Sequence, residues 1–383
     1  MRNLIKEVVA LIILLAAATP SAARTWSVAQ DGSGDWTTIQ ESFDAAASGD
    51  TIFIAAGRYS ELHMAPGYNN LPVVAYLAEA KDLTIVGVGE EDVVIGPEVY
   101  VENSIALFFD VTLTLSISGI QLVNSWEGIA AYGRTILTDC TFYDNKGHGF
   151  GKMSGGVIAS NCSFSAPSHP SAISFMVRDS QDVDISNCSF YDMYIYLDGV
   201  SNGIIRDCVF EHPEGRNQSL SVNYINSNGL IVGAITDGMV GCAGVSQLVI
   251  RNSVFRKGTA WFNLSVSEKD AHVEVHDSVM EGGTYCTVHL SSAPSIIGSG
   301  NHFLNGGTEF SIVLQYYGEY SNNPKVDLRG NYWGTNDPAQ IDAWIYDIHD
   351  DPNEDTEVLY QPFSDVPLPT EKKSLGSFKS LYR

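Results

Sequence analysis

The sequence predicts an all-β fold, a single-stranded right-handed parallel β-helix (solenoid) with a short helical cap at each end. A phrase made of an aliphatic strand, an Asn or Asp, a small residue and an aromatic residue recurs along the chain. Successive copies lie 20 to 26 residues apart, or about twice that, which is a spacing typical of solenoids. The clearest copies are Ile136–Phe142, Ile158–Phe164, Asp184–Phe190, Ile204–Phe210 and Val249–Phe255.

The phase of the repeat predicts strands that meet at a corner. Before Phe190, apolar residues stand at Cys188, Ile185 and Val183, so two steps of two enclose one step of three. Steps of two are strand periodicity, and the step of three marks a bend. Asn and Asp tolerate the left-handed conformation that a tight bend needs. The corner residues are Asp139, Asn161, Asn187, Asp207, Asn252 and Asp277.

Both ends of the predicted β-helix domain, residues 24–365, carry helix signals. Thr37 and Gln40 fit a Thr-x-x-Gln capping box at the start of a helix, and Thr51–Ile54 then begins the first coil. Asp337 before Pro338 fits the N-cap and first position of a second helix. Such caps cover the apolar ends of a solenoid. The Pro-, Lys- and Ser-rich residues 366–383 predict a flexible C-terminal tail.

Residues 1–23 have the pattern of a cleaved signal peptide. Arg2 and Lys6 precede the apolar run Val8–Ala18, and small residues follow at Ser21–Ala23. The run is too short to span a bilayer, and the small residues suit cleavage after Ala23. We therefore expect a secreted or periplasmic protein that does not insert into the membrane and is a monomer.

Four of the six cysteines occupy the same slot of successive copies of the repeat. They are Cys140, Cys162, Cys188 and Cys208. In-register side chains on stacked strands point the same way, so we expect buried free thiols rather than disulfides. The chain has no Cys-x-x-Cys motif or Cys/His pair at zinc-ligand spacing, and no metal site is assigned.

The two ends of the domain resemble a known superfamily. Val28–Glu61 is similar to the opening of pectinesterases, and within it Gly57–Glu61 looks like their GxYxE motif. Gly330–Asn353 resembles the closing segment of many secreted right-handed β-helix repeat proteins. With the Asn-Cys-x-Phe coils, the chain is identified as a member of the pectin-lyase-like superfamily. The resemblance implies the β-helix fold and a role on polysaccharides.

The catalytic motifs of those families are absent. We find neither the paired aspartates and arginine segment of pectinesterases nor the arginine and calcium cluster of the lyases. Gly147-His148-Gly149 looks like the GHG of polygalacturonases, but the other segments of that active site are missing. A lone three-residue match is weak, so we interpret Asn145–Phe150 as a loop leading into a strand, with a structural role for His148.

One strand of each coil, after the long loop, is expected to face the ligand groove. The candidates are Ile173–Val177, Ile195–Leu197, Phe262–Val266, Cys286–Leu290 and Ile312–Leu314. If the aliphatic residues of these strands point inward, the alternating positions expose Arg178, Asp198 and His289. These three are the candidate catalytic groups, which together could supply an electrostatic clamp and an acid–base pair. The same alternation exposes Tyr196, Asn263 and Gln315 as candidate substrate-binding residues. The alternative is an ordinary polar outer face.

The charge of the chain restricts its partners. With 21 basic and 45 acidic residues, the net charge is −24, which disfavours nucleic acid and polyanions. Neutral polysaccharide or cell-surface glycan fits better, and no cofactor is required. The densest acidic cluster offers either a Ca²⁺ site or a solvated loop, and it lacks the ligand spacing of an EF-hand. It consists of Asp347, Asp350, Asp351, Glu354 and Asp355.

Two functional classes follow from the sequence. The first is an exported β-helix protein that binds polysaccharide through an exposed face of the solenoid, with or without processing it. The alternative is a polysaccharide-degrading enzyme of the pectate lyase, pectinesterase or glycoside hydrolase type with a non-standard site. The fold alone does not decide between them, and the sequence leaves open whether the protein is an enzyme.

Overall fold

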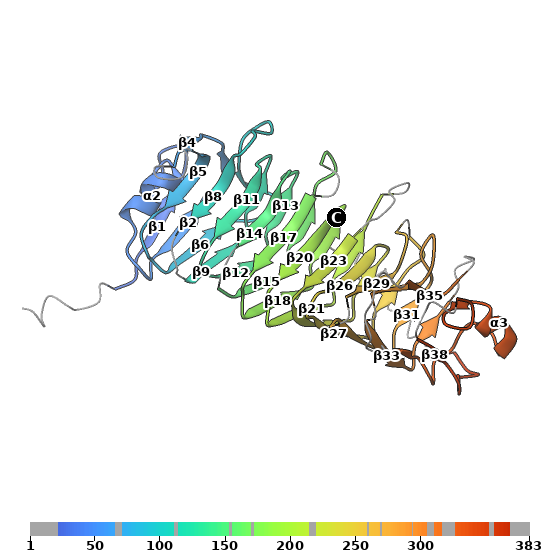
Figure 1. Ribbon diagram of the computed structural model, residues 1–383. Helices are drawn as coiled ribbons and strands as arrows, with labels where there is room; N and C mark the ends of the chain where they lie inside the picture. The colour runs from blue at the N-terminus through green and yellow to red at the C-terminus, as the bar shows by residue number, and fades with distance from the viewer. Residues whose placement is uncertain are drawn as a thin grey trace, which may run out of the picture.

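The computed structural model describes residues 22–367, except 66–70, 111–113, 153–154, 170–171, 214–219, 259, 269, 293, 305–309, 316–325 and 352–355. The predicted signal peptide and most of the predicted tail therefore lie outside the described residues. Figure 1 shows one elongated solenoid whose coils follow one another along the sequence from the N-terminal to the C-terminal end. Each coil contributes strands to three sheets, which we name A, B and C.

Sheet A, as far as the structure describes it, has 14 strands. In spatial order they are β1 (Thr25–Val28), β2 (Thr51–Ile54), β6 (Leu83–Gly87), β9 (Thr114–Ser118), β12 (Arg134–Thr138), β15 (Val157–Ser160), β18 (Asp182–Ser186), β21 (Asn202–Arg206), β24 (Asn228–Val232), β27 (Gln247–Arg251), β30 (His272–His276), β33 (Ser295–Ser299), β36 (Val326–Asp327) and β38 (Val358–Leu359). Sheet A runs from one end of the described solenoid to the other.

Sheet B follows sheet A in each coil and has 11 described strands. They are β3 (Gly57–Tyr59), β7 (Val93–Ile95), β10 (Gln121–Val123), β13 (Thr141–Tyr143), β16 (Ser163–Ser165), β19 (Ser189–Tyr191), β22 (Val209–Glu211), β25 (Ile235–Thr236), β28 (Val254–Phe255), β31 (Val279–Met280) and β34 (His302–Phe303). These strands are short because each lies between two corners.

Sheet C completes the coil, with 13 strands among the described residues. They are β4 (His63–Met64), β5 (Pro72–Leu77), β8 (Ile105–Phe109), β11 (Glu127–Ala131), β14 (His148–Lys152), β17 (Ala172–Arg178), β20 (Met193–Asp198), β23 (Leu220–Ile225), β26 (Met239–Ala243), β29 (Leu264–Ser267), β32 (Val288–Ser291), β35 (Ile312–Gln315) and β37 (Ile345–Tyr346). The pair β4–β5 is antiparallel, whereas β5 pairs with β8 in parallel like the strands that follow.

The corner between sheets A and B has the predicted geometry. All six predicted corner residues have a positive φ between 49° and 54°. Left-handed backbone costs most residues roughly 1–2 kcal/mol, and Asn and Asp offset part of it by local hydrogen bonding. The predicted order of strand, Asn or Asp corner and strand is therefore confirmed.

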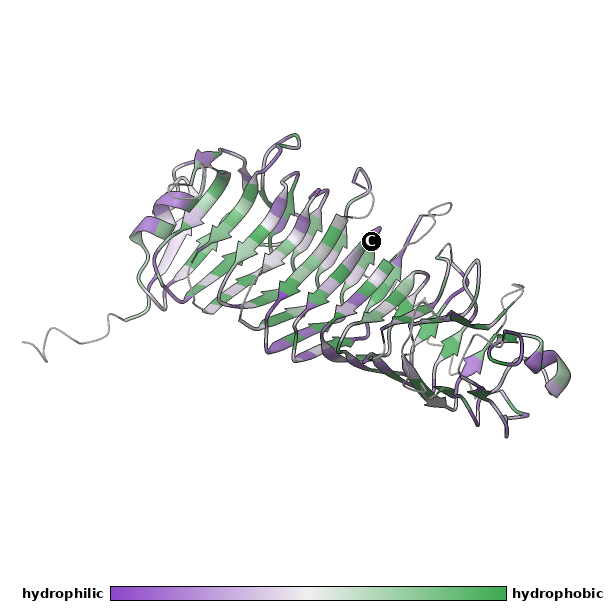
Figure 2. Cartoon of the chain, in the orientation of Figure 1, coloured by the Kyte–Doolittle hydropathy of each residue, from purple (hydrophilic) through white to green (hydrophobic). Residues whose placement is uncertain are grey.

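The core is built from vertical columns of equivalent residues. Phe142, Phe164, Phe190 and Phe210 are all buried, and neighbouring rings stack with centroids 4.5–5.1 Å apart. Figure 2 shows hydrophobic residues recurring along the strands of successive coils. The predicted cysteine column lies beside the rings, and all six cysteines are buried and free. Burial raises the pKa of the Cys188 thiol, so we expect these thiols to be unreactive.

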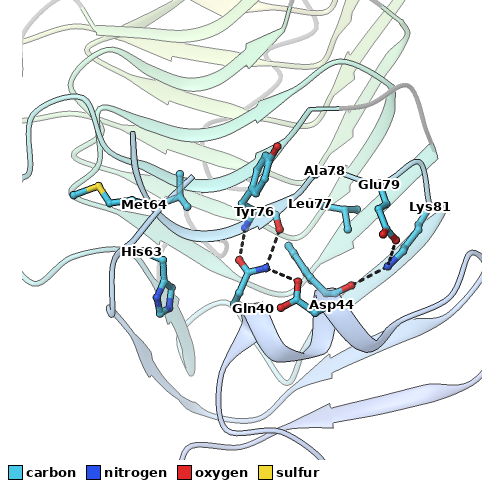
Figure 3. A pocket seen from close by; sticks show the side chains of 11 residues that line it. Gln40, Asp44, His63, Met64, Tyr76, Leu77, Ala78, Glu79 and Lys81 are labelled. Carbon is cyan, nitrogen blue, oxygen red and sulfur yellow. Dashed lines mark hydrogen bonds and ion pairs between the residues drawn. The ribbon is translucent and has the colours of Figure 1, made fainter. Parts of the chain in front are cut away.

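Helix α2 (Ile39–Ala45) caps the N-terminal end, but its capping box is one residue later than predicted. Thr38, not Thr37, is the N-cap, and its partner is Glu41, not Gln40. Gln40 instead docks the helix onto β5, accepting from the Tyr76 amide and donating to the Tyr76 carbonyl (Figure 3). The Thr-x-x-Glu pairing prevails because a carboxylate accepts both backbone N–H groups better than an amide.

At the opposite end, α3 (Pro338–Asp342) follows the predicted N-cap, Asp337. The Asp337 carboxylate accepts from the Ala339 amide at 3.0 Å, and Pro338 occupies the first turn. Ile341 is buried against the core. The structure thus confirms short helical caps at both ends.

Among the described residues, a second apolar cluster covers the outer face of sheet C at its N-terminal end. Val73, Ile105, Phe108 and Ala130 form this cluster, separate from the main core, together with Ala65 beyond β4. The cluster ends with Ala130 on β11, and Glu127 and His148 follow Ile105 in the register of this face on β11 and β14. The face therefore becomes accessible at β11, where the candidate site begins.

Candidate functional site

Register along sheet C decides which predicted site residues lie together. Arg178 on β17 pairs directly with Asp198 on β20, and Met176 pairs with Tyr196. The Arg178 guanidinium carbon lies 5.8 Å from the centre of the Tyr196 ring, a cation–π contact. The structure therefore brings together three of the predicted residues, Arg178, Tyr196 and Asp198, on adjacent strands.

Arg178 has no anionic partner within the described part of the chain. No ion pair or hydrogen bond joins its guanidinium to another described residue, and its Nε is buried without a partner. By contrast, Arg206 on the outer face of sheet A forms an ion pair with Asp184. A half-buried guanidinium without a partner lacks stabilisation that a carboxylate or another acceptor of a ligand would supply.

An imidazole–carboxylate pair lies on the two preceding strands of the same face. His148 Nδ1 is 3.1 Å from Glu127 Oε1, and β11 and β14 place the two residues in register. Both side chains are partly accessible, 15% for His148 and 20% for Glu127. A side chain at Gly151 would meet Glu127 Oε2 at 2.9 Å, so glycine leaves room for the carboxylate.

This pair is arranged for proton transfer. When Glu127 accepts a hydrogen bond from Nδ1–H, Nε2 of His148 carries the lone pair of the neutral ring. Nε2 makes no hydrogen bond with any residue that the structure describes. An oriented imidazole with a free nitrogen is suited to act as a general base.

The sequence contained a signal for this pair that we interpreted differently. Glu127 and His148 are 21 residues apart, which is one coil of the repeat. The Gly147-His148-Gly149 match was judged by motif alone, and Asn145–Phe150 was expected to be a loop. In the structure β14 begins at His148, and buried Asn145 holds the corner by accepting from the Ser125 amide.

Aromatic and charged side chains lie in the segments just before β8, β11 and β14. Trp126 packs against Gly147, where a Cβ would come within 2.6 Å of the indole. Lys146 pairs with Glu102 at 3.2 Å and lies 5.2 Å from the centre of the Tyr100 ring. These contacts tie the segment before β8 to the corner before β14, and they hold the start of β14 in place.

His289, the third predicted catalytic residue, lies elsewhere on sheet C. It is on β32, four strand steps beyond β20, or roughly 19 Å at the usual strand spacing. The predicted acid–base pair of Asp198 and His289 is therefore wrong. His289 instead contacts Gln315, a predicted substrate-binding residue on the next strand: its Nε2 is 2.8 Å from Gln315 Oε1.

Two residues near His289 differ from their predicted orientation. Asn263 was expected to be exposed but is fully buried; its amide donates to the Arg256 carbonyl and accepts from the Gly282 amide. It is a structural corner residue, so we withdraw it as a substrate-binding candidate. Alternation that exposes Asn263 would turn the neighbouring Phe262 inward, but Phe262 stacks on the His289 ring, with centroids 4.4 Å apart. The cause is that β29 begins at Leu264, so alternation does not extend to the corner.

The burial of His289 predicts a pH dependence of stability. Burial lowers the pKa of His289 below its ordinary value of 6.5, although the Gln315 contact opposes the shift. The unfolded chain then binds more protons than the folded one at acid pH. We expect the free energy of unfolding to fall as the pH drops below about 6.5, by at most about 1.4 kcal/mol per pH unit for this group.

Urea titrations between pH 8 and 5 measure this effect. His289→Gln should make the free energy of unfolding depend less steeply on pH. Part of the dependence should remain because burial also lowers the pKa of His302. His349→Gln is the control, because that side chain is 68% exposed. Equal slopes for the wild type and His289→Gln would contradict the assignment.

The acidic loop at the C-terminal end uses its oxygens internally. The Asp347 carboxylate accepts from the His349 and Val358 amides, and Asp350 Oδ2 accepts from the Asp347 amide. Glu354 and Asp355 lie outside the described residues. Within the described ranges, no group of three or more His, Cys, Asp or Glu side chains is placed to hold a metal ion.

A groove of about 500 Å³ lies between α2 and β5 at the N-terminal cap (Figure 3). Its polar groups largely bond with each other. Gln40 Nε2 donates to Asp44, and Lys81 contacts both Glu79 and the Phe43 carbonyl. We therefore interpret this groove as part of the cap rather than as a ligand site.

Comparison with known proteins supports the fold. Residues 103–233 match the family model described as right handed beta helix region. This range includes Glu127, His148, Arg178 and Asp198. No curated protein matches the sequence at a significant level.

Two similar solved structures carry the names of polysaccharide-acting enzymes. The A-module of mannuronan C-5 epimerase AlgE4 from Azotobacter vinelandii has a TM-score of 0.44 and 11% identity, over 85% of this chain and 94% of that chain. Pectin methylesterase from carrot has a TM-score of 0.35 and 12% identity, over 79% and 90%. At these values the two structures carry no argument about the activity of this chain.

The three sheets and the matched family model define a right-handed parallel β-helix protein. The fold expected from the resemblance to the pectin-lyase-like superfamily is thereby confirmed. Separately, none of the described helices is long and apolar enough to cross a membrane.

Proposed function

We propose that this is an exported protein that binds polysaccharide on the outer face of sheet C, at the strands β11 to β20. The observation that carries the proposal is Arg178, a guanidinium with no anionic partner among the described residues, held against the Tyr196 ring. A planar cation beside an aromatic face suits a sugar unit that offers a carboxylate or another acceptor next to its C–H surface.

The neighbouring side chains are compatible with a sugar. Tyr194 lies on the same strand as Tyr196, and burial, together with Tyr196, raises the pKa of its hydroxyl, so the hydroxyl stays protonated as a donor. Aromatic surface combined with a few polar groups is typical of ligand sites. Tyr191, in the same coil, lies on sheet B and is not part of this face.

The net charge and the local site favour different ligands. The chain carries −24 overall, which disfavours a uniformly anionic polymer. Arg178 supplies a local positive charge, which favours an acceptor group at one position. A polysaccharide of low charge density, with acidic or acylated units spaced along it, satisfies both conditions.

The Glu127–His148 pair supports a second candidate function, the processing of the bound polysaccharide. The pair provides a general base whose free nitrogen is not bonded to any described residue. Arg178 lies at the other end of the neighbouring strand, since His148 pairs with Ile173 and Lys152 pairs with Val177, so it would hold an adjacent unit of the bound chain rather than the reacting unit. Binding without turnover remains the first candidate, because it requires only Arg178 and the tyrosines.

Export is part of the proposal and is supported by the sequence of residues 1–23. The positively charged start, the apolar run Val8–Ala18 and the small residues before Arg24 follow the order of a signal peptide. Mass spectrometry of the mature protein after expression with residues 1–23 in place would test this point. An intact N-terminus in the cell fraction would contradict export.

A glycan array followed by titration of the hits tests the binding site. Arg178→Ala should weaken binding by about ten- to a hundredfold, because a hydrogen bond to a charged group is worth about 1.5–3 kcal/mol. Arg206→Ala is the matched control, since Arg206 lies on sheet A and pairs with Asp184. Undiminished binding by Arg178→Ala would move the site elsewhere, and a wild type that binds no glycan would refute the proposal.

A further inference from the structure

A cluster of aromatic side chains lies in the corners just before β29 and β32, at the C-terminal part of the solenoid and away from Arg178. Trp261 and Tyr285 are among the more exposed large apolar side chains of the described residues, at 43% and 46%. Phe262 lies between them, with its ring edge-to-face to Trp261 at 6.4 Å and to Tyr285 at 6.0 Å. We call Trp261, Phe262 and Tyr285 the aromatic platform.

Backbone hydrogen bonds hold the platform rigidly. The amides of Tyr285 and Cys286 both donate to the Trp261 carbonyl, at 3.0 and 3.2 Å. The two corners that carry Trp261 and Tyr285 are therefore stacked like neighbouring strands. A Cβ at Gly283 would come within 2.2 Å of the Trp261 carbonyl oxygen, so the close approach of these corners requires glycine.

Polar groups adjoin the platform without adding charge. Phe262 stacks on His289, which bonds with Gln315, and Nδ1 of His289 is buried without a partner. Ser265 lies beside His289 in the register of β29 and β32. Burial lowers the pKa of His289, which keeps the ring neutral. Uncharged donors and acceptors beside flat apolar rings match the pattern of hydroxyls and C–H faces on a sugar.

We propose that the aromatic platform is a second binding subsite for the same polysaccharide, for sugar units that present a flat C–H face and no charge. The inference rests on the proposed function, since both subsites are taken to hold one chain. The stacking of Phe262 on His289 supports this, because His289 and Arg178 both lie on the outer face of sheet C. The low charge of the platform, in a chain of net charge −24, favours uncharged units there.

The separation of the subsites sets the length of glycan that reaches both. The platform residues precede β29 and β32, which are four and five strand steps from β17 in sheet C, or about 19–24 Å at the usual spacing. A short oligosaccharide can occupy one subsite only. A long one occupies both, and the second contact then forms at a high effective concentration, so the overall affinity exceeds that of either subsite alone.

Isothermal titration with a tetrasaccharide and a decasaccharide from one polysaccharide hit of the array tests this prediction. The wild type should bind the decasaccharide at least about tenfold more tightly than the tetrasaccharide. The variant Trp261→Ala/Tyr285→Ala should lose this difference. Trp261→Tyr should retain most of it, since an aromatic face remains, and quenching of Trp261 fluorescence by the decasaccharide should disappear in both variants.

The variant Tyr143→Ala/Tyr191→Ala is the matched control, because it removes two tyrosines of similar exposure, 43% and 42%, from sheet B. Failure of the inference and failure of the proposed function give different results. If the platform variant keeps the length dependence while Arg178→Ala weakens binding, the platform is not a subsite. If Arg178→Ala binds normally while the platform variant does not, the platform binds glycan and the site at Arg178 is wrong.

Discussion

Phe190→Ala is expected to lower the free energy of unfolding by about 3–5 kcal/mol, the usual cost of deleting a buried phenylalanine ring. Phe190 is 1% exposed and stacks between Phe164 and Phe210, with centroids 5.1 and 4.6 Å away. In a solenoid each coil is stabilised only by its two neighbours. Loss of one ring therefore weakens two coil–coil interfaces at once.

Urea unfolding followed by circular dichroism measures this loss. Phe190→Leu should cost less, because it retains most of the apolar volume. Phe53→Ala on sheet A is the control, since that ring is 38% exposed, and its loss should change stability by less than about 1 kcal/mol. A loss below 1 kcal/mol for Phe190→Ala would contradict its position in the stacked column.

The fold could be predicted because its determinants are local and repeated. Asn187 enables the corner, Cys188 fills the small slot beside it and Phe190 fills the large slot, all within four residues. The same constraint recurs in each coil, so an error in one copy is corrected by the others. The positive φ of Asn187 and the burial of both neighbours confirm this part of the prediction.

The site was harder to predict because core packing does not constrain the columns of outward-facing side chains. Alternation correctly placed Arg178, Tyr196 and Asp198 on the outer face of sheet C. It failed at Asn263 and Phe262, which lie in a corner before β29, where the backbone is not extended. Strand periodicity predicts which side of the sheet a side chain points to only for residues within the strand itself.

Distance along the solenoid was the second obstacle. Residues one coil apart lie about 4.8 Å apart, so sequence separation divided by the repeat gives the separation along the axis. Glu127 and His148 are 21 residues apart and touch, whereas Asp198 and His289 are four strand steps apart and do not. Counting coils would have separated His289 from Asp198 and joined His148 to Glu127.

His148→Gln is expected to reduce turnover of a bound polysaccharide by about 10²–10⁴-fold while leaving its affinity nearly unchanged, because a general base contributes in the transition state. Glu127→Gln should cause a smaller loss, since it weakens the hydrogen bond that orients the imidazole at 3.1 Å. The measurement combines absorbance for unsaturated products, an assay for new reducing ends and titration of released acid.

A His–Glu contact on the far side of the solenoid supplies the control for this prediction. His276 lies 3.5 Å from Glu274 on sheet A, and His276→Gln should leave turnover unchanged. Equal turnover by wild type and His148→Gln would exclude His148 as the base. If the wild type binds a glycan but yields no product in any of the three assays, the processing candidate fails and binding through Arg178 and Tyr196 remains as the function of this face.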